Sequence, residues 1–142
     1  MSSTYTIIIE TPKGAFIKRN ERGGIDLISP FPCPFNYGHV QGHMGCDGDP
    51  LDAIVLGDRL PYNSRKQLPV VGRVLFIDEG KEDHKYIFAD REVTFKEEEK
   101  LKKFFRFYAQ IKSIQGLLLF RGCPALFSGL EWGSMDLSQY MG

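Results

Sequence analysis

Short apolar and β-branched runs recur through the first two thirds of the chain, with glycine, proline and asparagine between them. The runs are YTIIIE at 5–10, AFIK at 15–18, IDLI at 25–28, LDAIVL at 51–56, VVGRVLFI at 70–77 and HKYIFA at 84–89. Runs of this length, bounded by turn-forming residues, are typical of β-strands. The pattern therefore predicts a small β-barrel or β-sandwich.

After residue 94 the hydrophobic period changes to that of a helix. The apolar positions at helical spacing are Leu101, Phe104, Phe105, Tyr108 and Ile111. Thr94 and Glu97 have the spacing of a capping box, in which each side chain satisfies a backbone N–H of the other residue. Gln115-Gly116 resembles a helix stop signal. We expect a helix over about 95–113.

The remainder of the chain carries weaker signals. LLLF at 117–120 is compatible with a strand, and SMDLSQYM at 134–141 predicts a short helix capped by Ser134. The segment between them has no clear period.

Length and charge limit the possible functions. The chain has 142 residues, 42% hydrophobic and 25% charged, which is ordinary for one globular domain. Eighteen basic and 18 acidic residues leave no net charge, which argues against general nucleic-acid binding. No apolar stretch reaches the ~20 residues of a membrane span. The odd number of cysteines without CxxC spacing favours reduced thiols, so we expect a cytoplasmic protein without a membrane partner.

Acidic residues cluster at the start of the fourth run. Asp47, Asp49 and Asp52 lie beside Gly48 and Pro50. Gly48 permits a tight approach of the backbone, whereas Pro50 fixes its own φ and biases Asp49 toward an extended conformation. A turn near Pro50 would bring the three carboxylates around one point. Like charges at that separation need a shared cation, and carboxylates are preferred ligands of hard divalent ions. The segment therefore predicts a metal site.

A second acidic pair lies in a predicted hairpin around Gly80. Asp78 ends one run and Asp83 begins the next, so a hairpin would place both carboxylates at one rim. Lys85 follows Asp83 by two residues and therefore faces the same side of a strand. With the first cluster, this arrangement predicts Mg²⁺ bridging a phosphate, with Lys85 neutralising a phosphate oxygen. Hairpin tips also collect Asp and Gly for structural reasons, and that alternative stays open here.

Three co-linear motifs resemble the soluble family I inorganic pyrophosphatases. They are FNYG at 35–38, DGDPLD at 47–52 and DEGKEDHK at 78–85, within a resemblance over about residues 5–112 and, more weakly, LEW at 130–132. The resemblance implies one α+β, mainly β domain over residues 1–142. That domain would be a five-stranded OB-like closed barrel, with helix 95–113 and a short C-terminal helix packed on it. It also implies Mg²⁺-dependent hydrolysis of pyrophosphate to two orthophosphates by a homo-oligomer.

The resemblance further implies a role for each matching residue. The implied metal ligands are Asp47, Asp49, Asp52, Asp78, Asp83 and Glu10. The implied substrate-binding residues are Lys18, Tyr37, Lys85 and Tyr108. The implied catalytic residues are Asp49, Tyr37 and Lys85, with Asp49 as general base through a water that bridges two metals. Each has a structural alternative: core packing for the tyrosines, solvent exposure for the lysines and a strand end for Glu10. His39 and His43 invite a zinc reading, but no third ligand has suitable spacing.

Three positions depart from the family pattern. Asn20 stands where the family has a glutamate, and Ala109 follows Tyr108 where the family has a lysine. The family's phosphate-binding arginine has no counterpart in the shortened segment 21–38. The substitute cations we considered are Arg19, Arg22 and Lys112. Fewer cations predict reduced activity on pyrophosphate or adaptation to another phosphoanhydride.

Two further functions remain as alternatives. The missing cations are compatible with a non-catalytic homologue that binds metal or polyphosphate. Binding of single-stranded nucleic acid, known for other OB barrels, is disfavoured by the acidic rim and the zero net charge.

Overall fold

The computed structural model describes residues 3–19, 25–28, 32–45, 48–78, 80–118 and 125–140. For residues 17–19, 25–28, 115–118 and 139 it describes the backbone without the side chain. The elements are β1 (Thr4–Thr11), β2 (Ile17–Arg19), β3 (Ile25–Ile28), β4 (Asn36–Met44), β5 (Pro50–Val55), β6 (Arg65–Asp78), β7 (Lys81–Glu82), β8 (Lys85–Phe88), α1 (Phe95–Leu118), β9 (Leu126–Trp132) and the 3₁₀ helix η1 (Ser138–Tyr140).

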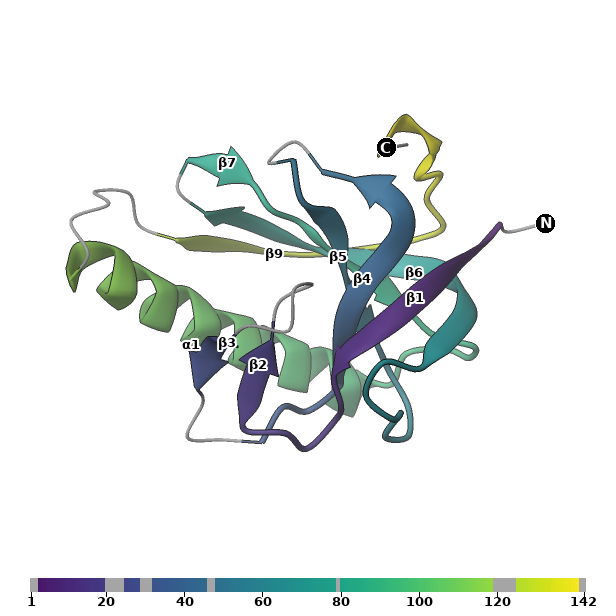
Figure 1. Ribbon diagram of the computed structural model, residues 1–142, viewed down its shortest axis with the longest axis horizontal. Helices are drawn as coiled ribbons and strands as arrows, with labels where there is room; N and C mark the ends of the chain where they lie inside the picture. The colour runs from purple at the N-terminus through teal and green to yellow at the C-terminus, as the bar shows by residue number, and fades with distance from the viewer. Residues whose placement is uncertain are drawn as a thin grey trace.

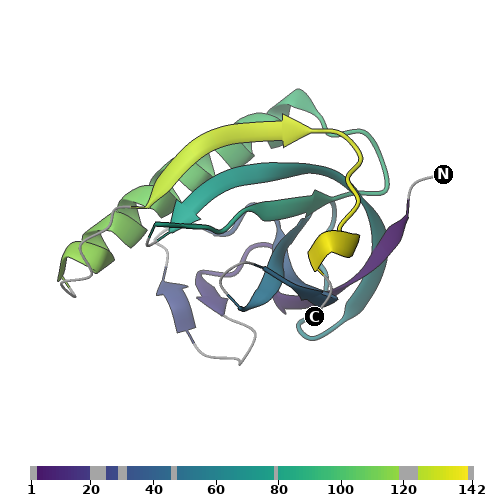
Figure 2. The same ribbon diagram turned by 90° about the horizontal axis from the view of Figure 1, so that it is seen from above.

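Five strands close into a barrel, as the sequence predicts. The strand order β1-β4-β5-β8-β6 returns to its start because β6 also pairs with β1. All these neighbours are antiparallel except β5 and β8, which are parallel. β9 extends the sheet along β6, and the two strands run side by side in Figure 2. The short β2–β3 hairpin forms a separate sheet outside the barrel (Figure 1).

Alternation along the barrel strands creates two apolar layers. β6 shows the alternation most clearly, because every second residue from Leu68 to Phe76 is buried and the residues between them are partly exposed. One cluster draws on all five barrel strands and fills the interior; Ile9, Ala53 and Phe88 belong to it. The other cluster lies between the barrel wall and α1. The candidate tyrosines Tyr37 and Tyr108 are in this second cluster.

A glycine allows β1 and β4 to approach closely beside Tyr37. A Cβ atom on Gly38 would lie 1.9 Å from the Ile8 carbonyl oxygen, which no side chain can occupy. Gly38 pairs with Ile9, and Tyr37 pairs with Thr11. Gly38 therefore lets this part of β4 lie close against β1.

Helix α1 begins as predicted and ends later than predicted. The Thr94 Oγ1 accepts a hydrogen bond from the Glu97 amide at 3.2 Å, and the Thr94 amide donates to Glu97 Oε1 at 3.1 Å. The capping box is thus confirmed. The predicted end at residue 113 is wrong, because the helix continues through Gly116 to Leu118. A glycine inside a helix costs only about 1 kcal/mol, which a long packed helix offsets.

Several other elements differ from the sequence prediction. The strands β4 and β9 were not predicted, whereas Leu117 and Leu118 belong to α1 and not to a strand. Residues 119 and 120 lie outside the described residues. The helix predicted over 134–141 is reduced to η1, and Asp136 rather than Ser134 caps it, since Asp136 Oδ1 accepts the Ser138 amide at 2.9 Å. Within the described ranges, no helix is long and apolar enough to span a membrane.

Candidate active site

A lysine bridges two aspartates at the centre of the site. Lys85 Nζ lies 2.6 Å from Asp52 Oδ2 and 2.6 Å from Asp83 Oδ2. The two carboxylate oxygens can therefore be no farther apart than twice that distance. We call Lys85, Asp52 and Asp83 the buried ion cluster. It joins one residue from each predicted acidic segment to the predicted lysine.

The lysine of the buried ion cluster packs against two aromatic rings. Lys85 is 1% exposed, and its ammonium lies 5.3 Å from the ring centroid of Phe76 and 5.9 Å from that of Tyr108. Burial alone would lower the pKa of Lys85, but the Asp52 and Asp83 carboxylates outweigh it, so the net shift is upward. Lys85 therefore remains charged, with its positive end held at the acidic rim.

The predicted hairpin positions Asp83. β6 and β7 pair through Ile77 with Glu82 and Asp78 with Lys81. The Asp83 amide then donates to the Phe76 carbonyl at 2.9 Å, which places Asp83 across from Phe76. Asp83 consequently lies on the side of the sheet that carries Lys85. Asp78 ends β6 and is partly exposed.

A turn ahead of β5 carries Asp49. The Gly45 amide donates to the Asp49 carbonyl at 2.8 Å, and Gly48 has a positive φ of 83°. The turn thus precedes Pro50, which already pairs with Met44 as the first residue of β5. The turn expected near Pro50 is therefore present, and Gly48, with no Cβ, adopts its left-handed conformation. Asp49 is exposed on this turn.

Glu10 lies next to His39, and His39 lies opposite Asp52 on the neighbouring strand. Glu10 is 7% exposed, and its Oε1 lies 3.5 Å from His39 Nδ1. His39 is the register partner of Asp52 across β4 and β5. From the sequence, we expected no role for His39 beyond the rejected zinc site. His43 lies elsewhere, with its ring 5.3 Å from that of Tyr5.

The two tyrosines lie in the helix-side core. Tyr37 is 1% exposed and Tyr108 is 2% exposed, so both contribute to packing. Lys112 Nζ lies 5.7 Å from the Tyr108 ring centroid, so Lys85 and Lys112 both flank this ring. Ala109, where the family has a lysine, is buried against the same cluster.

Five residues named from the sequence lie outside the described residues or are described by their backbone alone. Asp47, Asn20 and Arg22 lie outside the described residues. Lys18 and Arg19 belong to β2, but only their backbone is described.

The donor set suits a hard cation but is incomplete within the described residues. Carboxylate oxygens are typical Mg²⁺ ligands, and Asp52 and Asp83 already share one cation. In the parts of the chain that the structure describes, no three His, Cys, Asp or Glu side chains are close enough to hold a metal. Asp47, a further carboxylate of the same motif, lies outside those parts.

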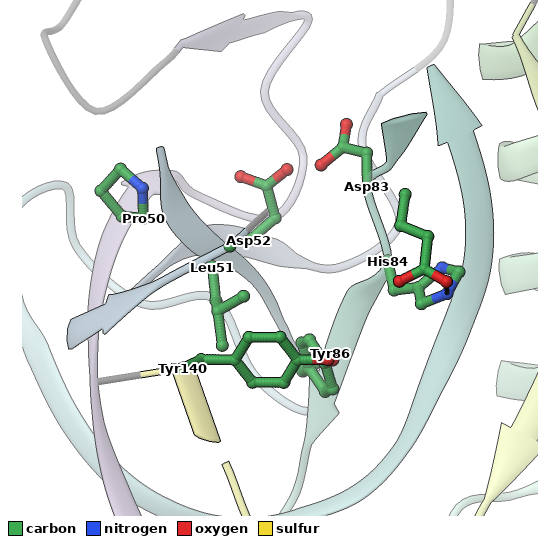
Figure 3. A pocket seen from close by; sticks show the side chains of 9 residues that line it. Pro50, Leu51, Asp52, Asp83, His84, Tyr86 and Tyr140 are labelled. Carbon is green, nitrogen blue, oxygen red and sulfur yellow. Dashed lines mark ion pairs between the residues drawn. The ribbon is translucent and has the colours of Figure 1, made fainter. Parts of the chain in front are cut away.

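A pocket lies next to the acidic residues and includes side chains that the sequence did not suggest. Its walls include Leu51, Asp52, Asp83, His84, Tyr86 and Tyr140. In Figure 3 the carboxylates of Asp52 and Asp83 lie on one side and the rings of Tyr86 and Tyr140 on the other. His84 Nδ1 accepts the Phe76 amide at 3.0 Å. Burial lowers the pKa of His84, which favours the neutral ring.

Comparison with known proteins agrees with the barrel and the motifs. The family model for inorganic pyrophosphatase matches residues 7–117. The inorganic pyrophosphatase of Bacillus sp. (strain PS3) is 31% identical over 125 residues, which are 76% of this chain and 76% of the relative. That of Saccharolobus solfataricus is 34% identical over 97 residues, 62% of this chain and 56% of the relative.

Solved structures give the same fold. The inorganic pyrophosphatase of Helicobacter pylori superimposes with a TM-score of 0.73 at 24% identity, covering 92% of this chain and 85% of that one. The enzyme of Thermus thermophilus gives 0.69 at 23% identity, covering 92% and 83%. The fold and the acidic rim together define a barrel of the pyrophosphatase type. The chain belongs to the inorganic pyrophosphatase family.

Proposed function

We propose that this protein hydrolyses inorganic pyrophosphate to two orthophosphates with the help of Mg²⁺. The observation that carries the proposal is Lys85, a fully buried lysine held at 2.6 Å by two carboxylates from separate motifs. Buried charges are costly and are rarely kept without a function. Membership of the inorganic pyrophosphatase family supports the same substrate.

The proposed metal ligands are carboxylates at the rim. They are Asp47, Asp49, Asp52, Asp78, Asp83 and Glu10. Bound Mg²⁺ would neutralise phosphate oxygens and lower the pKa of water. Several ions would be needed, because pyrophosphate brings up to four negative charges of its own.

The chain's own residues would then bind the substrate and move the proton. Lys18, Lys85, Tyr37 and Tyr108 would hold the phosphate oxygens. A water oxygen attacks one phosphorus atom, and the bridging P–O bond breaks with its electron pair on the departing phosphate. The proton of the attacking water passes to the Asp49 carboxylate, whose exposed position on the turn leaves it accessible. Lys85 would stabilise negative charge as it develops.

Phosphate release from pyrophosphate with and without Mg²⁺ tests this proposal. We expect Mg²⁺-dependent turnover and a loss of about 100-fold or more in kcat for Asp49→Asn, because general bases contribute at least that factor. Asp58→Asn is the matched control, an exposed aspartate in another turn. No turnover by the purified protein, or an unchanged Asp49→Asn variant, would contradict the proposal.

A non-catalytic homologue is the second candidate, and one observation favours it. Ala109 is buried and apolar, so the residue next to Tyr108 brings no cation to the site. Calorimetry that detects pyrophosphate binding without phosphate release would select this alternative. The same absence predicts a rate below that of relatives with a full set of cations.

We also propose a homo-oligomer in the cytoplasm, which the sequence predicts. The buried thiol of Cys33, which donates to the Phe35 carbonyl at 3.1 Å, is compatible with a reducing compartment. Sedimentation of the purified protein would measure its state of assembly.

A further inference from the structure

The strands that carry Asp52 and Lys85, β5 and β8, are not joined by backbone pairing where the acidic site begins. The parallel ladder of β5 and β8 begins with Ala53 opposite Tyr86. Asp52 and Lys85, one residue earlier on each strand, lie outside that ladder. We call this opening the β5–β8 mouth. Contacts across it therefore control the separation of the acidic side chains.

One such contact is the ion pair of Lys85 with Asp52, on the side of the sheet that faces α1. The pocket described above lies at the same mouth, and Tyr140 forms part of its wall. Tyr140 comes from η1, far from β5 and β8 in the sequence. Figure 3 shows its ring extending under Leu51 toward Tyr86. The β5–β8 mouth is thus bounded by Lys85 on one side and Tyr140 on the other.

The short helix η1 is anchored firmly enough to hold this ring in place. Leu137 is 1% exposed and packs in the barrel-interior cluster. Its amide donates to the Tyr5 hydroxyl at 3.0 Å, which ties η1 to β1. The Tyr140 amide in turn donates to the Leu137 carbonyl at 3.0 Å. Two contacts of Leu137 therefore fix the start of η1 against the barrel, and the bond from the Tyr140 amide joins Tyr140 to that anchor.

Tyr140 meets a residue whose own position is well determined. The ring centroids of Tyr140 and Tyr86 are 6.0 Å apart at an interplanar angle of 58°. Tyr86 is 2% exposed and pairs in register with Arg73, which pairs with Glu131 on the next strand. Arg73 Nη2 lies 2.9 Å from Glu131 Oε1. Tyr140 therefore packs on a residue that is buried and paired with a neighbouring strand on each side.

We propose that Tyr140 is a positioning residue of the acidic site: its ring closes the pocket at the β5–β8 mouth and holds Asp52 and Asp83 at the separation at which they share a cation. The positioning role rests on the place of Tyr140 in the pocket wall and on its contact with Tyr86. Its consequence for Mg²⁺ rests on the proposed function. No substrate contact is assigned to Tyr140.

Two measurements separate the positioning role from its consequence. The first is amide hydrogen exchange in the metal-free protein, at Ala53–Val55 and Tyr86–Phe88. We expect Tyr140→Ala to speed exchange selectively at these amides, whereas Tyr140→Phe keeps the ring and stays near the wild type. The second is Mg²⁺ affinity by calorimetry. We expect Tyr140→Ala to weaken it about tenfold, the usual effect of losing a residue that orients metal ligands.

Two control variants distinguish positioning from general loss of stability. Tyr62→Ala removes an exposed tyrosine from a distant turn and should change neither measurement. Leu101→Ala opens a cavity in the helix-side core and should lower Tm without selective exchange at the β5–β8 mouth.

The outcomes are distinct. Unchanged exchange in Tyr140→Ala would overturn the positioning role, whatever the metal does. Selective exchange with unchanged Mg²⁺ affinity would overturn the link to the metal. A wild type that neither binds Mg²⁺ nor releases phosphate would contradict the proposed function, and the exchange data would still decide the role of Tyr140.

Discussion

Two groups of ion pairs in this protein have nearly the same distances and opposite surroundings. In the buried ion cluster, Lys85 lies 2.6 Å from each of two aspartate oxygens and is 1% exposed. In the surface ion cluster, defined here as Arg91, Glu97 and Thr94, Arg91 contacts the two Glu97 oxygens at 2.8 and 2.9 Å and is 47% exposed.

The difference shows that burial, more than distance, decides what an ion pair does. At the surface, water and salt screen the charges, and the Arg91–Glu97 pair mainly reinforces the start of α1. In the buried ion cluster, little solvent reaches Lys85, so removing it would leave two nearby carboxylates without their cation. The surface pair serves the fold, whereas the buried one holds charges in an arrangement suited to an anionic substrate and a metal.

The largest effect is expected from Lys85→Met. Loss of the ammonium should lower the free energy of unfolding by about 3 kcal/mol without metal, because Asp52 and Asp83 then repel each other. Mg²⁺ should restore part of the loss, since it can replace the cation. Urea unfolding with and without Mg²⁺ measures both. Lys81→Met, an exposed lysine of the same hairpin, is the control. Equal stability of Lys85→Met and wild type would remove the distinction between the two clusters.

The next effect concerns Lys112, which lies over the ring that also contacts Lys85. We expect Lys112→Ala to raise KM for pyrophosphate about tenfold, the worth of one charge-assisted hydrogen bond, with a smaller change in kcat. Steady-state kinetics measures the changes in KM and in kcat separately. Lys112→Arg should retain most of the affinity, and Ala109→Lys should restore it in the Lys112→Ala background. Lys103→Ala, on the exposed face of α1, is the control; an equal effect there would argue against a role for Lys112.

A smaller effect is expected in the surface ion cluster. Thr94→Ala removes the side chain that accepts the Glu97 amide and should cost about 1 kcal/mol of stability, as for other N-caps. Phosphate release should stay unchanged, because this end of α1 is not part of the acidic rim. Thr94→Ser, which keeps the hydroxyl, should retain the stability in thermal unfolding. A loss of activity in Thr94→Ala would show that the two clusters are coupled.

The smallest effect is the pH dependence of the surface ion cluster. The hydrogen bond from Arg91, followed by those of Thr94, lowers the pKa of Glu97 to about 2, against partial burial. A depressed folded-state pKa contributes stability above the unfolded pKa near 4.5, and this contribution is lost as pH falls toward 2. The stability difference between wild type and Glu97→Gln should therefore be constant above pH 5 and shrink below it. Screening keeps it below about 1 kcal/mol, and a difference independent of pH would contradict the assignment.

Much of the barrel was predictable because its signals are local. The runs at 5–10, 51–56 and 70–77 alternate or are continuously apolar, and they became β1, β5 and β6. Thr94 and Glu97 predicted the start of α1, because the two residues of a capping box are only three positions apart in the sequence. β9 was missed because its mixture of exposed and half-buried residues has no period, and its pairing with β6 is long-range.

The candidate site was predictable only in part. The motifs identified Asp52, Asp83 and Lys85, and the structure brings these three together. His39, Tyr86 and Tyr140 could not be identified, since each gains its position from strands or turns distant in the sequence. The roles of Asp49, Asp78, Glu10 and the other implied residues stay predictions.

The sequence by itself determined the family, the capping of α1 and the identities of the acidic residues, because these depend on short motifs and neighbouring positions. Only the tertiary structure decided which carboxylates share Lys85, how deeply that lysine is buried and which side chain closes the β5–β8 mouth. Burial and cross-strand contacts depend on how distant segments pack. The sequence of one strand does not specify which residues of a neighbouring strand lie opposite its own.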